Sequence, residues 1–213
     1  MAILMLNTKI EMQSAIGSAK TITAISKASE ASITATHDFS VGDYIIIADV
    51  VGMVEINKRL VRVKTVSTTV SFVAEGLDST NFTTYASGGT ATKVTTFLAF
   101  DNATSFSFPE PSPNRIDVTP INSNQKVEVF GLDDSPQISI PMLAAPNSAH
   151  VIEMRKASLA KTTRAFKVTT QDGQILIMNA FVAGGRGFDG QVGQAATSTA
   201  QLTLAAPEQW FAS

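Results

Sequence analysis

Short runs of β-branched residues, separated by turn-forming residues, recur along most of the chain and constrain its fold more than any other feature. Residues 44–47 read Tyr-Ile-Ile-Ile and directly follow the turn signal Val-Gly-Asp at 41–43. Residues 60–66 alternate between apolar and polar side chains, as a strand with one solvated face does. A further run follows at 70–73. Since Val, Ile and Thr fit pleated, half-buried surfaces, the sequence predicts a mainly β protein.

The spacing of these runs divides the chain into two regions. From residue 29 to residue 94 the strands are short and closely spaced, and we interpret this stretch as a small, self-contained β module. From residue 95 to residue 213 the elements are longer. The segments 8–12 and 20–26 resemble two further strands, which we assign to the second region. The prediction is a larger β domain, made of residues 1–28 and 95–213, with the module inserted at 29–94.

The second region contains one convincing helix, at residues 148–160. Asn147 or Ser148 is available to cap its free N–H groups. Its expected apolar stripe is modest, so we expect the helix to lie on a sheet. The residues of that stripe are Ala149, Ile152, Leu159 and Ala160.

The strands around this helix complete the predicted fold. Asp172-Gly173 supplies the tight turn of a hairpin between strands at 163–170 and 174–183. A final alternating strand is expected at 197–205, and residues 122–136 are expected to form a long polar loop. The predicted fold class is mainly β, a β-sandwich or barrel domain with one helix and an inserted, small barrel-like domain.

Composition excludes several classes of function. The formal net charge of −2 provides no basic surface for tight nucleic-acid binding and no polybasic patch for a membrane. The absence of cysteine excludes disulfides, Cys-based zinc sites and thiol catalysis, and it fits synthesis in a reducing cytoplasm. No apolar stretch approaches the length that spans a membrane, so membrane insertion is not expected.

The residues that carry chemistry are few and scattered. His37 and His150 are the two histidines, and neither has the spacing of a metal ligand pair. Residues 185–190 match Gly-x-Gly-x-x-Gly, but a Gln/Ala/Thr/Ser stretch follows instead of the helix that a dinucleotide site requires. We therefore expect no enzymatic activity, no cofactor and no metal.

In the order and spacing of its elements, the second region resembles the major tail tube proteins of bacteriophages with long, non-contractile tails. The resemblance covers residues 95–213 together with the N-terminal strands. The segments that carry it are 114–119 (Asn-Arg-Ile-Asp-Val-Thr), 126–134, the helix at 148–160, 166–173, 179–182 and the terminal alternating strand.

The inserted module has a resemblance of its own. Residues 38–43, 52–53, Asn57 and 85–90 are similar to a small β-barrel module of phage tail and fibre proteins, which is sometimes likened to a domain of ubiquitin-activating enzymes. Because the chain has no cysteine, the enzymatic association has no chemical support.

The tail tube resemblance implies a structural protein of the virion, made in the cytoplasm of a bacterial host. Copies of the chain would form rings, commonly hexamers, that stack into a tube for DNA ejection. The implied partners are other copies of the chain and the tape-measure, tail-terminator and tail-tip proteins. Double-stranded DNA would pass through transiently and without specific binding.

The resemblance also assigns residues to contacts and to the lumen. Contacts between subunits and rings fall on the long loop and the N-terminal strand, at Asn122, Lys126, Glu128, Phe130, Asp133, Asp134 and Lys9. Because DNA has to slide, a lumen should present polar groups without tight phosphate pairing. Strands rich in Ser and Thr meet this requirement, so Lys167, Thr169, Thr199 and Gln201 are candidates for the lumen lining. Because Lys167 and Arg164 are basic, the sign of its charge stays open.

Two other functions stay open from the sequence. One is a related tube or terminator protein that shares the fold and forms a single ring. The other is a carbohydrate-binding or adhesion module of a tail fibre, in which Tyr44, Tyr85 and Trp210 stack on sugars. Core packing explains these aromatic residues more simply.

Overall fold

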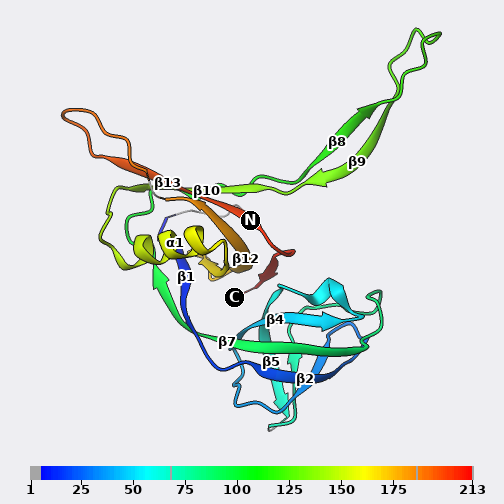
Figure 1. Cartoon of the computed structure of the whole chain (residues 1–213). Coiled ribbons are helices and arrows are strands. Elements are labelled where there is room, and N and C mark those ends of the chain that lie inside the picture. Colours follow the sequence, from blue (N-terminus) through cyan, green and yellow to red (C-terminus); the bar gives the residue numbers. More distant parts are fainter. Residues whose placement is uncertain (1–5, 68, 186, 213) are drawn as a thin grey trace.

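The computed structural model describes residues 6–67, 69–185 and 187–212. The protein is mainly β, with one α-helix among the described residues and a closed, six-stranded antiparallel barrel (Figure 1). The fold class predicted from the sequence is therefore confirmed. A second, helix-covered unit lies beside the barrel, and a two-stranded arm stands away from both (Figure 1).

The barrel is formed by the short, closely spaced strands. They pair in the order β7-β2-β3-β6-β5-β4, and pairing of β4 with β7 closes the ring. A short 3-10 helix, η1 (Val54–Ile56), follows β4. The strands are β2 (Lys20–Ile25), β3 (Ser32–Ala35), β4 (Tyr44–Val51), β5 (Leu60–Ser67), β6 (Ser71–Ala74) and β7 (Ser87–Ala99).

Aliphatic and aromatic side chains fill the barrel because alternate residues of each strand point inward. Phe72 of β6 is fully buried and meets the rings of Phe39 and His37 edge-on, at centroid distances of 5.4 and 5.5 Å. His37 stacks on Phe39, and its Nδ1 accepts a hydrogen bond from the Phe39 N–H. His37 is thus a packing residue of the barrel core.

Strand β2 belongs to the barrel, which differs from the expectation that residues 20–26 join the second region. Lys20 and Thr21 pair with β7, and the rest of β2 pairs with β3. Both units share β7, whose 13 residues span the boundary between them. Its first part pairs with β4 and β2, and its last part pairs with β1 (Lys9–Ile16).

The second unit continues the same sheet in the order β10-β13-β12-β11-β1-β7. Helix α1 packs against β12, and a core that includes Met12, Phe166 and Met154 lies between helix and sheet. The remaining elements of this unit are β10 (Gln137–Leu143), α1 (Ala149–Ala160), β11 (Thr163–Thr169), β12 (Ile175–Gly184), β13 (Thr197–Leu204) and β14 (Gln209–Phe211), which pairs with β12.

Sequence predicted the local elements of this unit well. The helix expected at 148–160 is α1, and the final strand expected at 197–205 is β13. The Asp172-Gly173 hairpin is also confirmed, because β11 pairs with β12 and Gly173 has a φ of 81°, which favours glycine.

The face and the cap of the helix were predicted wrongly. The buried residues of α1 are His150, Val151, Met154 and Ala157, whereas Ile152 and Leu159 of the expected stripe are exposed. Ser148 occupies the cap position, but its hydroxyl donates to the carbonyl of Ala145 instead of accepting from the helix. Three of the four buried residues are apolar, so the sequence is compatible with this face as well as with the predicted one, and the contact of α1 with β12 decides between them.

His150 makes the stability of this unit sensitive to pH. Burial lowers the pKa of its imidazole, and the carboxylate of Asp101 opposes that effect. The folded protein therefore binds this proton less readily than the unfolded chain, so stability falls as pH drops through the ordinary imidazole pKa of about 6.5. We expect His150→Gln to lose less stability than the wild type between about pH 7.5 and about pH 5.5 in urea titrations. If the wild type and His150→Gln lose the same free energy of unfolding over this pH range, the prediction is wrong.

A mixed apolar and polar junction fixes the two units to each other. Leu60 and Val94 of the barrel are buried against Ala165, Ile177 and Phe211 of the second unit. The Arg62 guanidinium lies 4.2 Å from the centre of the Phe211 ring. The amide of Asn179 on β12 donates a hydrogen bond of 2.8 Å to the carbonyl of Lys58 in the barrel.

Candidate functional site: the β8–β9 arm

The arm is a two-stranded antiparallel sheet, separate from the main sheet, that projects into solvent (Figure 1). It consists of β8 (Ser112–Asp117) and β9 (Glu128–Asp134), and every residue of β8 is exposed. A further hydrogen bond, from the Val118 N–H to the Val127 carbonyl, extends the pairing toward the tip. The long polar loop expected at 122–136 is therefore mostly the tip and second strand of a hairpin, and that prediction is corrected.

One face of the arm is aliphatic. Residues that pair across an antiparallel ladder share a face, and faces alternate along each strand. Ile116 pairs with Val129, and the bonded pair Val118 and Val127 lies two residues further along on the same side. These four side chains form what we call the aliphatic face, and their exposed fractions lie between 44% and 52%.

The opposite face is polar and internally paired. Glu128 forms ion pairs with Lys126 and with Arg115, the latter at 3.5 Å. The hydrogen bond from Lys126, with the nearby charges, lowers the pKa of the Glu128 carboxyl. The hydroxyl and N–H of Thr119 bond to Asp117 and likewise lower its pKa. Phe130, which is 68% exposed, lies on this face near Arg115.

Six of the seven predicted contact residues lie on this arm. Asn122 and Lys126 belong to the tip, and the other four belong to β9. Lys9 lies on β1 in the second unit and is not brought close to them by any pairing. The contact role of these residues stays a prediction.

The four residues assigned to a lumen share one face of the main sheet, as their positions in β11 and β13 show. Lys167 is not free there, because its ammonium is 2.7 Å from the Glu11 carboxylate and lies over the ring of Phe97. Thr199 and Gln201 are exposed on β13, and Thr169 ends β11.

Sequence reasoning missed the aliphatic face itself. The signal was present as two short alternations, Ile116-x-Val118 and Val127-x-Val129, on either side of the polar stretch 119–126. Each alternation spans only three residues, which is too short to indicate by itself that the two segments pair with each other.

Comparison with known proteins relates the barrel to one family. Residues 30–95 match the FCCH domain of ubiquitin-activating enzyme E1. The matched stretch begins just before β3 and ends within β7, so it contains β3, β4, β5 and β6 and the larger part of β7 but not β2. No curated protein matches the chain.

This finding contradicts the resemblance to phage tail tube proteins. The family that matches is that of ubiquitin-activating enzymes, and no phage protein is among the matches. The functions predicted from the sequence are therefore wrong as well: stacked rings that conduct DNA, a single-ring terminator and an adhesion module of a tail fibre. An ordered set of strands, turns and one helix describes a topology, and topology alone does not define function.

The remaining predictions have different outcomes. The lumen assignment loses its basis with the tube. The tape-measure, tail-terminator and tail-tip partners and the location in a virion stay predictions without further support. The likeness of the inserted module to a domain of ubiquitin-activating enzymes agrees with the match.

Two further observations concern chemistry and membranes. In the part of the chain that the structure describes, no three His, Asp or Glu side chains gather as a metal site. Within the same residues, no helix has the length and apolarity needed to cross a membrane.

Proposed function

We propose that the protein is a non-enzymatic binding protein that associates with a second copy of itself through the β8–β9 arm. The observation that carries the proposal is the aliphatic face, which combines Ile116, Val118, Val127 and Val129 on a ribbon that stands alone in solvent. A protein that functions as a monomer gains nothing from such a face, because exposed aliphatic patches promote association.

The arm by itself is a marginal structure. An isolated two-stranded hairpin has little stability in water and needs a further layer over its apolar side. Two arms stacked with their aliphatic faces together would supply that layer to each other, as two sheets about 10 Å apart do. The paired charges of Arg115, Lys126 and Glu128 would remain on the outside, in contact with water.

A second copy is the simplest partner for this face. A two-fold axis brings the same patch together from both subunits, and such dimers are the commonest oligomers. The patch carries no charge, so its like-with-like contact meets no electrostatic repulsion. The two outer edges of the arm also have unpaired main-chain groups, which favours association of strands.

The expected association is weak. Completing the burial of eight half-exposed Val and Ile side chains contributes about 8 kcal/mol, at roughly 1 kcal/mol each. Lost translational and rotational freedom offsets a large part of this, because that cost is roughly 4–15 kcal/mol. At the low end of this cost about 4 kcal/mol remain, so we expect a dissociation constant on the order of 1 mM for the isolated protein.

The rest of the molecule supports a binding role without catalysis. The chain has no cysteine, so it cannot form a thioester through a thiol of its own. The buried histidines His37 and His150 are engaged in ring contacts with Phe39 and Phe100. We propose that the barrel, which matches the FCCH domain, is a rigid support for the arm, because the junction with the second unit fixes it in place.

Sedimentation velocity of the full chain, from about 10 µM to about 1 mM, tests the proposal with two matched variants. Val129→Glu places a charge on the aliphatic face, and we expect it to remain monomeric throughout. Phe130→Glu makes the same kind of change one residue away, on the polar face, and should dimerise like the wild type. A wild type that stays monomeric, or variants with the opposite behaviour, would overturn the proposal.

A further inference from the structure

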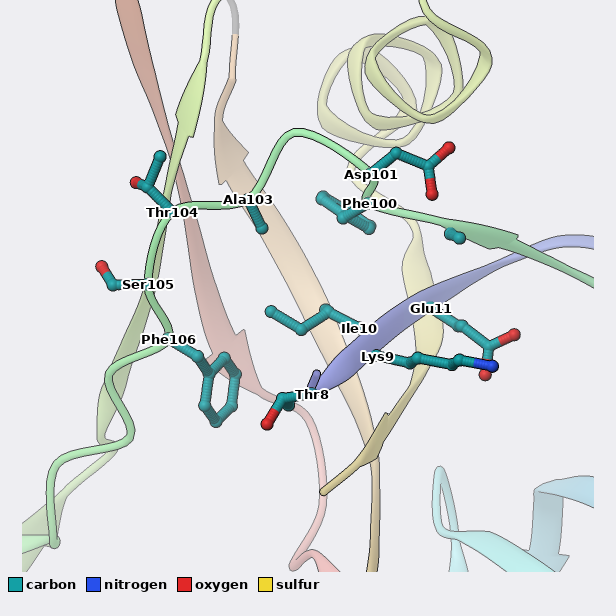
Figure 2. A pocket seen from close by; sticks show the side chains of 11 residues that line it. Thr8, Lys9, Ile10, Glu11, Phe100, Asp101, Ala103, Thr104, Ser105 and Phe106 are labelled. Atoms are coloured by element: carbon teal, nitrogen blue, oxygen red, sulfur yellow. The ribbon is translucent and has the colours of Figure 1, made fainter. Parts of the chain in front are cut away.

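A slot opens in the second unit where β7 leaves β1. The last strand contact is the hydrogen bond of 2.9 Å from the Phe100 N–H to the Ile10 carbonyl. The chain then crosses to β10, where the N–H of Thr104 bonds to the Pro141 carbonyl. A cavity of about 480 Å³ separates the start of β1 from residues 103–106, and Figure 2 shows it between these two segments.

Both walls of the slot carry polar groups without partners. Thr8, Ser105 and Phe106 make no hydrogen bond with any residue that the structure describes. The Thr8 hydroxyl is buried and unpartnered, and Thr8 lines the slot (Figure 2). A buried hydroxyl without a hydrogen-bond partner destabilises the folded protein, which indicates that a bound ligand supplies the partner.

The lining combines these polar groups with apolar side chains. Ile10, Phe100 and Phe106 line the same cavity, and all three belong to the core of this unit or pack against it (Figure 2). Lys9, Glu11 and Asp101 also line it. The Glu11 carboxylate is paired with the Lys167 ammonium at 2.7 Å, which leaves Lys9 and Asp101 as one charge of each sign outside that ion pair. The slot therefore has no strong preference for a charged ligand.

We infer that this slot binds an extended peptide segment, which adds a strand between β1 and residues 103–106. The reason is the kind of groups that need partners. Because the Ile10 carbonyl faces β7, alternation along the strand turns the main-chain groups of Thr8 to the same side, toward the slot. A second main chain in extended form can satisfy groups on both walls at once, as in strand addition at a sheet edge.

The chemistry of the slot defines the ligand more closely. Side chains that point inward would meet Ile10, Phe100 and Phe106, so we expect aliphatic residues at alternate positions. The Thr8 hydroxyl has almost no exposed surface in the free protein, so it would rotate about χ1 to donate to a main-chain carbonyl of the peptide. No residue of the arm lines the slot, so the absence of the proposed dimer would not affect peptide binding at the slot.

The probe is an acetylated and amidated hexapeptide with the sequence Lys-Val-Thr-Val-Thr-Lys, titrated into the ¹⁵N-labelled full chain. We expect saturable shifts of the amide signals of Thr8, Ile10 and Ser105. The same peptide with N-methyl groups on its valines should bind at least tenfold more weakly, because it lacks main-chain donors. Equal binding of both peptides, or no binding, would overturn the inference.

Two variants of the slot separate binding from folding. Thr8→Val removes the unpartnered hydroxyl, so it should raise the thermal midpoint of the free protein and weaken peptide binding about tenfold. Ala103→Leu fills the slot and should abolish the shifts, whereas Ala160→Leu, at an exposed position of α1, should leave them unchanged. A Thr8→Val protein with unchanged stability and unchanged binding would show that water satisfies this hydroxyl, which also overturns the inference.

Discussion

Phe72→Ala is expected to lower the free energy of unfolding by about 3–5 kcal/mol, which is a large part of the total for a domain of this kind. Phe72 has no exposed surface, and it forms the centre of the aromatic cluster with His37 and Phe39. Its removal leaves a cavity that a closed barrel cannot easily collapse, because each strand is paired on both sides. Urea denaturation followed by circular dichroism measures the loss.

The same variant tests whether the barrel and the second unit unfold together. Trp210 is the single tryptophan. It lies on β14, which pairs with β12, and it lines a pocket with Arg59 and Leu77 of the barrel, so its fluorescence reports on the junction between the two units. Because β7 runs through both units, we expect the fluorescence and dichroism transitions of Phe72→Ala to shift equally. An unchanged fluorescence transition would show that the barrel unfolds alone. Phe130→Ala, at an exposed aromatic residue of the arm, is the control and should change stability by less than about 0.5 kcal/mol.

Local elements of the fold could be predicted from sequence because each has a local cause. The Asp172-Gly173 pair dictates a tight turn, and the alternation at 60–66 marks β5, whose Val61 and Val63 point into the barrel. The helix at 148–160 was predicted from the capping residues Asn147 and Ser148 and the apolar residues that follow them. Each of these signals operates over a few residues, within the range that turn chemistry and side-chain periodicity control.

Assignments that depend on distant partners could not be predicted in this way. The place of β2 depends on its pairing with β7, about 70 residues further along the chain, which no local pattern records. The buried face of α1 depends on which side meets β12, so His150 is inside and Leu159 is outside. Tertiary contacts override local preference in both cases.

The candidate sites show the same limit. Sequence pointed to residues 122–136 as important but described them as a polar loop, because the pairing of Ile116 with Val129 was not visible. The slot at Thr8 could not be predicted at all, since it arises where two segments separate. Its residues are ordinary in composition, and only their unpaired main-chain groups distinguish them.

Asn179→Asp is expected to cost about 3–5 kcal/mol of stability near neutral pH, because it leaves an unpaired charge inside the junction between the two units. Asn179 is 2% exposed, and its amide donates to the Lys58 carbonyl. A carboxylate in its place has no proton to donate, and its oxygen faces the oxygen of Lys58. Since Asn179 Oδ1 is buried without a partner in the native protein, the site offers little to stabilise a negative charge.

The pH dependence of this variant distinguishes charge from shape. Burial raises the pKa of the introduced carboxyl above its value in the unfolded chain, so the destabilisation is complete above the folded pKa. It disappears as pH falls below the unfolded pKa of about 3.9, where a neutral carboxyl can donate to Lys58 again. Asn179→Leu removes the hydrogen bond without adding a charge, so its loss, about 1–3 kcal/mol, should not depend on pH. Equal and pH-independent losses in the two variants would show that the junction admits enough water to solvate the charge, and that the two units are held together less tightly than their buried contacts indicate.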